Sequence, residues 1–518
     1  MAKIINLKNV FIFASIAIVA MSVIVRIIMY IKCRSLWLDE AMFVENIISR
    51  NWLELLATPL INLQSSPVLY VIAVKAIGSI FGYSEGSLRI FSFFAFIGLL
   101  ICEMIFLKKI FNFNNCRIAF VVVMSALFPC YIWYSNELKP YMSDAFFALL
   151  ITLLYFYYTQ GKIKLPILTV LYILILGFSS PVLFFIGGAL LFEFVSAILN
   201  KNKKQMLYIA ISGIVILAIF ALYYHWWLQP VSEAMKISWD SKARDRSIIL
   251  RIGLIFSAKD RLSLFIWLFV PFALFGVYSL CKSKNKIACS LALSLSLVCL
   301  ASSIGKWPLA ARLWMFLPAI VFIFTPIGAD IVLNKLKNRK IMSAIGFSFL
   351  AALTLYLSVY CLEHAKHRMY YPTEEINPLI SYVQENIKDD EKLYVYPNAI
   401  FQFHYKNGYK ATKIGNATDN NIIYGKDPRE WDTNVLGNEL QSILENKKTY
   451  LLFCHHSEEI RHGLTFLRKY ETLTEMSTRF YHFKKNEIEN GLAVLRKYGT
   501  LTEIMNVYDT PLYYFERN

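Results

Sequence analysis

Two adjacent carboxylates, Asp39 and Glu40, come directly after the first long apolar segment, in the run Trp37-Leu38-Asp39-Glu40-Ala41. A carboxylate can act as the general base that takes a proton from the hydroxyl group of an acceptor. Acidic residues also favour helix N-termini, so the pair could instead begin a helix through Ala41–Ile48. This motif alone leaves both interpretations open.

A second group of polar side chains fills the short connection Tyr134-Ser135-Asn136-Glu137-Leu138-Lys139-Pro140-Tyr141, and Asp144 follows one helical turn later. An ion pair between Glu137 and Lys139 would be the ordinary explanation of its charges. Charged groups inside or close to a membrane are costly, however. Several of them in one short connection between two spans therefore favour a functional site.

Several cations are candidates for binding an anion. Arg89 ends the run Gly86-Ser87-Leu88-Arg89, and Lys306 and Arg312 lie on either side of Trp307. Arginine can bind a phosphate through two parallel hydrogen bonds, and lysine binds it as a point charge. Arg89 could also extend toward lipid headgroups from a helix end. Lys306 and Arg312 fall on the predicted outer side, where positive charge is disfavoured, which suggests a bound anion such as phosphate.

The composition indicates an integral membrane protein. Of the 518 residues, 57% are hydrophobic and 17% charged, and the mean hydropathy is +0.47. Soluble proteins carry about a quarter of charged residues. The net charge of +17 comes largely from lysines in alternate connections, so we expect membrane lipid and no nucleic acid as a partner.

The apolar segments predict an α-helical polytopic protein, because a spanning helix needs roughly 20 apolar residues. Eleven segments are candidates: Val10–Ile31, Ser87–Leu107, Ile118–Tyr134, Tyr141–Tyr158, Ile163–Phe178, Pro181–Leu199, Met206–Tyr224, Ser263–Leu280, Ile287–Ser303, Arg312–Ile331 and Ile341–Tyr360. Val68–Phe81 is too short to span and is predicted to be an interfacial helix in the first outer loop.

The charges of the connections predict the orientation. With eleven spans and a cytoplasmic N-terminus, every alternate connection is basic, as expected for cytoplasmic loops. Counting Val68–Phe81 as a span would reverse all later loops. We therefore expect a multi-pass protein of the cell (inner) membrane, with a transmembrane domain at residues 1–360 and an extracytoplasmic C-terminal domain at residues 361–518.

The C-terminal tail has ordinary polar composition and predicts a small α/β domain. Lys392–Tyr396 and Thr449–Cys454 are typical of short buried strands, and Asn377–Ile387 of a helix. The tail also contains a duplication, LTFLRKYETLTEM at Leu464–Met476 and LAVLRKYGTLTEI at Leu492–Ile504, to which we attach no function.

Taken in order, these motifs resemble a known family. The run WLDEA, the segment Gln64–Tyr70, the pattern FGxSExxLR, the run YSNELKPY and an arginine in a later outer loop are similar to bacterial GT-C glycosyltransferases of the family 39-like group. That group is related to protein O-mannosyltransferases and to the aminoarabinose transferase of lipid A. The resemblance covers roughly Leu36 to Pro318 and, more loosely, the outer tail.

The resemblance implies a polyprenyl-monophosphate sugar donor, used with inversion, and an envelope glycan, lipid or protein as acceptor. It implies that Asp39 is the catalytic base, with Glu40 as its acidic neighbour and Glu137 as a second acid. Lys139, Arg89 and Arg312 are then candidates for the donor phosphate. Further candidates for substrate binding are Lys306, Tyr141, Tyr70 and Asp144.

The chain departs from the family at one place. Many relatives have His-Pro-Pro-Leu-Tyr where this chain has Ser65-Ser66-Pro67-Val68-Leu69-Tyr70. Because the histidine is absent, we expect no firmly bound metal or other cofactor, although a divalent metal remains an alternative.

Three other functions stay open. A transporter or flippase for a lipid-linked sugar would need ionisable residues at mid-membrane and repeated halves, whereas the spans carry few charges, Glu103 and Glu193 among them. A polysaccharide polymerase would use lipid-diphosphate donors. A non-catalytic envelope protein would bind a partner through its tail.

Overall fold

The computed structural model describes most of the helical part of the chain and parts of the tail. The described residues are 7–62, 64–231, 233, 263–308, 311–334, 356, 359, 375–388, 391–395, 400–407, 413–414, 417–418, 422–424, 448–452, 499–507 and 510–517. They form two compact units. The first contains Met1–Lys32 and Trp52–Lys366, and the second contains Cys33–Asn51 and His367–Asn518.

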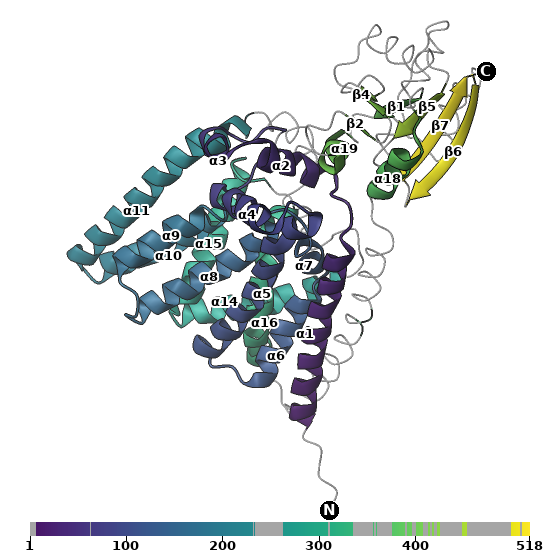
Figure 1. The fold of residues 1–518 in the computed structure, drawn as a ribbon. Helices are drawn as coiled ribbons and strands as arrows, with labels where there is room; N and C mark the ends of the chain where they lie inside the picture. The colour runs from purple at the N-terminus through teal and green to yellow at the C-terminus, as the bar shows by residue number, and fades with distance from the viewer. Residues whose placement is uncertain are drawn as a thin grey trace, which may run out of the picture. The chain divides into compact units, whose positions relative to one another are not determined.

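The first unit is a bundle of helices (Figure 1). Its described helices, in chain order, are α1 (Leu7–Lys32), α3 (Trp52–Ala57), α4 (Val68–Phe81), α5 (Glu85–Lys109), α6 (Asn115–Leu127), α7 (Pro129–Tyr134), α8 (Tyr141–Thr159), α9 (Leu165–Leu176), α10 (Val182–Leu199), α11 (Lys203–Tyr223), the π-helix η1 (Tyr224–Leu228), α14 (Ser263–Lys282), α15 (Lys286–Ser303), the 3-10 turn η2 (Ala311–Trp314) and α16 (Phe316–Asn334).

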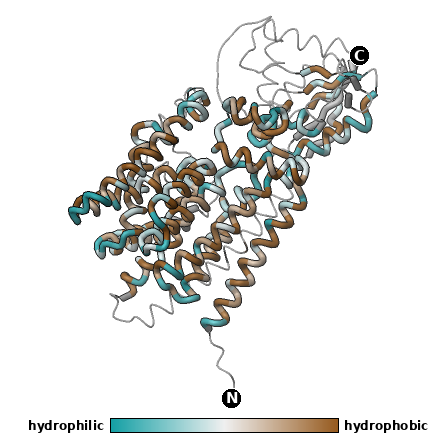
Figure 2. Tube along the Cα trace, turned by 60° about the vertical axis from the view of Figure 1, so that its left-hand side comes forward, coloured by the Kyte–Doolittle hydropathy of each residue, from teal (hydrophilic) through white to brown (hydrophobic). Residues whose placement is uncertain are grey.

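The polytopic prediction is confirmed. Seven of the described helices are long and apolar enough to cross a membrane, and four shorter helices are also apolar. Figure 2 shows the hydrophobic residues along these helices. Each of the first ten predicted spans coincides with helical structure. The eleventh, Ile341–Tyr360, lies outside the described residues except for positions 356 and 359.

Two predictions about short segments can be compared with the helices. The predicted interfacial segment Val68–Phe81 is the helix α4, and its place at the interface stays a prediction. The predicted span Ile118–Tyr134 is broken into α6 and α7, with Phe128 in an extended conformation between them. The cause is Pro129, which restricts the residue before it to extended backbone and favours the first position of a new helix.

Small residues allow the helices of the bundle to approach closely. A Cβ atom added at Gly328 of α16 would overlap the backbone of Phe272 in α14, and one added at Gly188 of α10 would overlap Ser294 in α15. Close backbone approach at small residues is a common way in which membrane helices associate. The core of this unit is apolar and aromatic, as at Phe96, Leu99 and Phe324.

The second unit joins a helix from the beginning of the chain to a sheet from its end. Its elements are α2 (Leu38–Ser49), α18 (Asn377–Asn386), β1 (Lys392–Val395), α19 (Ile400–Asn407), β2 (Lys413–Ile414), β3 (Ala417–Thr418), β4 (Ile422–Tyr424), β5 (Lys448–Leu452), β6 (Gly499–Val507) and β7 (Thr510–Arg517). The larger sheet has the order β4-β1-β5-β7-β6. Strand β1 pairs in parallel with β4 and β5, whereas β7 pairs antiparallel with β5 and β6.

The α/β character of the tail is therefore confirmed, with the predicted strands at β1 and β5 and the predicted helix at α18. Leu379 and Val383 of α18 pack with Leu393 of β1 and Phe403 of α19 in a separate apolar core. Most of the duplication lies outside the described residues, including all of its first copy.

Candidate active site

A buried hydrogen bond joins two of the polar motifs in the first unit. Lys139 Nζ donates to Gln64 Oε1 at 2.6 Å. Lys139 is 6% exposed and Gln64 is 4% exposed. Gln64 lies four residues before α4, and Lys139 lies in the connection between α7 and α8. The contact thus brings the start of the predicted interfacial helix to the YSNELKPY motif.

The connection between α7 and α8 is buried from Ser135 to Pro140 and is held from several sides. Arg26 of α1 donates from Nε to Ser135 Oγ at 3.0 Å and from Nη2 to the carbonyl oxygen of Ala126 at 3.0 Å. Asn136 Nδ2 donates to the carbonyl oxygen of Ile132 at 3.2 Å. These contacts fix the backbone on which Glu137, 2% exposed, is carried.

Helix α5 supports the same connection from the other side. Ser92 Oγ donates to the carbonyl oxygen of Lys139 at 3.2 Å, and the hydroxyl groups of Ser92 and Tyr70 are 3.5 Å apart. Arg89 lies three residues before Ser92, which places the two side chains on one face of α5. Arg89 is 3% exposed. Two predicted binding residues, Tyr70 and Lys139, are therefore connected through Ser92.

The start of α8 carries two more of the predicted residues. Ser179 Oγ donates to Asp144 Oδ1 at 2.6 Å. The guanidinium group of Arg312 lies 5.7 Å from the centroid of the Tyr141 ring, a cation–π distance. Tyr141 also packs edge-to-face on Tyr134, with ring centroids 5.1 Å apart. Arg312 therefore lies next to the last residue of the YSNELKPY motif; its role in binding the donor phosphate stays a prediction.

No described contact brings Lys306 into this group. Its side chain is exposed in the turn after α15, and its backbone N–H donates to the carbonyl oxygen of Ala301 at 2.8 Å.

Trp227 of η1 packs against the connection before α4. Trp227 Nε1 donates to the carbonyl oxygen of Ser66 at 2.8 Å, and Trp227 is 2% exposed. Within the described part of the chain, Ser66 Oγ and Asn136 Oδ1 are buried without a hydrogen-bond partner. Buried polar atoms are nearly always paired, so these two atoms are candidates for contact with a water molecule or another bound polar group.

The acidic pair lies on α2 in the second unit, and its two carboxylates differ. Glu40 is fully buried. Its Oε2 accepts hydrogen bonds from Arg34 Nη1 at 3.1 Å and from the backbone N–H of Trp37 at 3.3 Å. Glu40 therefore caps the N-terminus of α2, the role that the sequence had left open for the acidic pair Asp39 and Glu40. Asp39 is only partly buried, which makes it the more accessible acid.

The tail holds the segment that carries this acidic pair. Ser35 N–H donates to Glu375 Oε2 at 3.1 Å, Ser35 Oγ also donates to Glu375, and Asn377 N–H donates to Ser35 Oγ at 3.1 Å. Helix α19 packs against α2. Burial lowers the pKa of His404 on α19, and the nearby carboxylate of Glu45 on α2 opposes this shift.

The sequence-based prediction did not include Arg26 or Glu375. An arginine inside a predicted span was a usable signal for Arg26, because such residues usually face a polar group in the protein interior. Glu375 gave no signal, since its partner Ser35 is 340 residues away. Among the described residues, no three histidine, cysteine, aspartate or glutamate side chains are grouped so that they could hold a metal ion.

Comparison with known proteins supports the fold. No family model matches the chain, and no curated protein matches it. Two crystal structures of ArnT from Cupriavidus metallidurans are similar, one in the apo state and one bound to undecaprenyl phosphate. Each has 10% sequence identity and a TM-score of 0.52, covering 96% of this chain and 97% of ArnT.

The chain is thus a multi-pass α-helical membrane protein with a small α/β domain. Its fold is that of ArnT, the GT-C type, as the resemblance of its motifs implied.

Proposed function

We propose that this protein is a membrane glycosyltransferase that moves a sugar from a polyprenyl monophosphate to an acceptor of the cell envelope. The likeness to ArnT supports the class of enzyme, and one of the similar structures is bound to undecaprenyl phosphate. The observation that carries the proposal is the buried Lys139, held by Gln64. The segments that carry these two residues also contain two buried polar atoms without a hydrogen-bond partner in the described part of the chain, Ser66 Oγ and Asn136 Oδ1.

In the proposed reaction, the carboxylate of Asp39 takes the proton of an acceptor hydroxyl group. The acceptor oxygen then attacks the anomeric carbon as the bond from that carbon to the phosphate oxygen breaks, with inversion. The electron pair of this bond leaves with the polyprenyl phosphate. Because negative charge develops on the leaving oxygen, fixed cations lower the barrier.

The residues divide between these tasks according to their surroundings. Lys139 and Arg312 supply positive charge, and Arg89 adds a third buried or partly buried cation on α5. Glu137 is the second acid, two residues before Lys139. The binding site is also shaped by Tyr70 through Ser92, by Tyr141 through Arg312 and by Asp144 through Ser179. Lys306 is a peripheral candidate.

The two interior carboxylates that a transporter could use have structural contacts. Glu103 Oε1 accepts a hydrogen bond from Ser125 Oγ at 2.5 Å, which joins α5 to α6. Glu193 accepts hydrogen bonds from three other helices. Both carboxylates therefore form contacts between helices of the bundle, and Glu103 Oε2 is buried without a hydrogen-bond partner in the described part of the chain.

A donor comparison tests the function. Purified protein in detergent would be given labelled sugars on polyprenyl monophosphate or on polyprenyl diphosphate, together with envelope fractions as acceptors. We expect transfer from the monophosphate only. Transfer from the diphosphate only would indicate a polymerase. Movement of intact donor across vesicles without transfer would indicate a flippase and contradict the proposal.

A further inference from the structure

Three short connections at one end of the first unit are lined with lysines. They join α8 to α9, α10 to α11, and α14 to α15. At these connections lie eight lysines, two at the first and three at each of the others: Lys162, Lys164, Lys201, Lys203, Lys204, Lys282, Lys284 and Lys286. All eight are exposed, and the connections contain no aspartate or glutamate. We call these residues the lysine surface.

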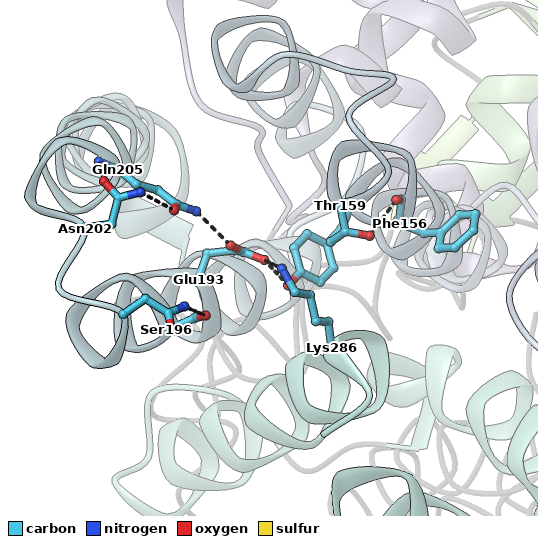
Figure 3. Close-up of polar contacts among 9 residues, drawn as sticks. Phe156, Thr159, Glu193, Ser196, Asn202, Gln205 and Lys286 are labelled. Carbon is cyan, nitrogen blue, oxygen red and sulfur yellow. Dashed lines mark hydrogen bonds and ion pairs between the residues drawn. The ribbon is translucent and has the colours of Figure 1, made fainter. Parts of the chain in front are cut away.

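A buried carboxylate shows that these connections are neighbours. Glu193 of α10 accepts hydrogen bonds from Tyr155 of α8 at 2.9 Å, Gln205 of α11 at 3.2 Å and Lys286 of α15 at 3.4 Å. In Figure 3, Gln205 and Lys286 point toward Glu193 from different helices. Because Gln205 and Lys286 lie at the first turns of α11 and α15, these contacts hold the helix ends together.

The charge of the lysine surface is left largely uncompensated by the protein. Glu193 is 3% exposed and pairs with Lys286. In the described ranges, none of the other seven lysines forms an ion pair with a carboxylate. Like charges on one surface repel each other and create a positive potential, so this surface attracts anions from outside the protein.

Tyrosine rings lie next to two lysines of this surface. The ammonium group of Lys162 lies 5.5 Å from the ring centroid of Tyr157, and that of Lys204 lies 6.0 Å from that of Tyr208. Tyrosines are enriched where the apolar part of a membrane meets water. The apolar helices continue directly from these rings, so the lysines stand where phosphate groups of a bilayer would lie.

We propose that the lysine surface binds the headgroups of anionic phospholipids. Clusters of basic residues directly beside apolar helices attract acidic lipids. Lysines act as mobile point charges without the fixed fork of arginine, which suits several headgroups in a fluid layer better than a single fixed phosphate.

This surface is separate from the candidate active site. Helix α8 has 19 residues, with Tyr141 at one end and Thr159 at the other, so its ends are about 28 Å apart at 1.5 Å per residue. The candidate site lies at the Tyr141 end, and the lysine surface follows Thr159. The proposal therefore does not depend on the proposed enzymatic function.

Lipid retention tests the proposal. The full chain would be purified in mild detergent with equal amounts of phosphatidylglycerol and phosphatidylcholine, and the retained lipid would be measured by native mass spectrometry. We expect selective retention of phosphatidylglycerol, reduced at least about fivefold in the double variant Lys282→Gln, Lys284→Gln. The double variant Lys282→Arg, Lys284→Arg keeps the charge and should retain the lipid.

A matched control has the same change of net charge elsewhere. Lys388→Gln with Lys406→Gln removes two exposed lysines of the second unit, and it should retain phosphatidylglycerol like the unmodified protein. Equal retention of the two lipids by the unmodified protein would overturn the proposal. So would unchanged retention in the Lys282, Lys284 glutamine variant, or an equal loss in the control.

Discussion

Lys139 and Gln64 form a hydrogen bond of 2.6 Å between side chains 75 residues apart in the sequence. Both are almost completely buried. Burying an ammonium group is costly unless its hydrogen bonds are satisfied, so Gln64 both stabilises the lysine and directs it. The bond links the start of α4 to the connection that carries Glu137, and it is the contact on which the proposed donor site is built.

Replacing Lys139 should weaken use of the donor. Lys139→Met removes a cation that would face the leaving phosphate, and we expect kcat/KM for the donor to fall by about 100-fold. Lys139→Arg should lose less, because the charge remains. Steady-state transfer at varied donor concentration measures both. Gln64→Ala removes the partner that positions Lys139 and should cause a smaller loss of kcat/KM. An unchanged kcat/KM in Lys139→Met would exclude Lys139 from the donor site.

Breaking the contact of Glu375 with Ser35 should loosen α2. Glu375→Ala removes the acceptor of two hydrogen bonds from Ser35, so amide hydrogen exchange in residues 33–51 should rise while α5 and α8 keep their protection. The control Glu385→Ala changes an exposed carboxylate of α18 and should leave exchange unaltered. Unchanged protection of α2 in Glu375→Ala would show that this anchor is dispensable.

Arg26 should be important for stability. Arg26→Met leaves Ser135 and the carbonyl oxygen of Ala126 without their charged donor inside the bundle. We expect the free energy of unfolding to fall by about 3 kcal/mol, with a smaller loss in Arg26→Lys. Thermal unfolding in detergent gives the comparison, with Lys32→Met at the exposed end of α1 as control. Equal melting temperatures for Arg26→Met and this control would contradict the assigned role.

The packing of α19 on α2 should weaken in mild acid. Burial lowers the pKa of His404 below its usual value, although the carboxylate of Glu45 opposes the shift. The unfolded chain therefore binds a proton at His404 more readily than the folded protein does. The packing of neutral His404 contributes fully to stability above the ordinary histidine pKa of about 6.5. This contribution is lost as the pH falls through the lower pKa of the folded state.

Hydrogen exchange in α2 and α19 between pH 7.5 and 5, corrected for the intrinsic rate, measures this effect. Exchange should rise toward pH 5 in the unmodified protein and change less in His404→Gln. An identical pH dependence in the two proteins would exclude His404 as the cause.

Local patterns predicted the helices and part of the tail. Long apolar runs gave ten spans that coincide with helices, and short apolar runs gave β1 and β5, because these elements depend on residues close in sequence. The break at Phe128 departed from the prediction, since the apolar run continues across it. There the geometry of Pro129 outweighs the hydropathy pattern.

Long-range contacts were beyond local patterns. The contact of Lys139 with Gln64 depends on how α4 and α8 each pack against α5. The contact of Ser35 with Glu375 joins segments that are 340 residues apart in the sequence. The capping role of Glu40 was one of the two alternatives for the acidic pair, and only the positions of Arg34 and the Trp37 N–H show which carboxylate takes it. The joint location of Asp39, Glu137 and Arg312 on the outer face stays a prediction.

The most direct test compares Asp39→Asn with Glu40→Gln. Sugar transfer from a polyprenyl monophosphate and the melting temperature would be measured for both. We predict that Asp39→Asn loses transfer by at least about 100-fold, the usual contribution of a general base, at an unchanged melting temperature. Glu40→Gln should lower the melting temperature, because Arg34 and the Trp37 N–H lose a charged acceptor, and keep more activity. Full transfer by a folded Asp39→Asn protein would contradict the proposed base.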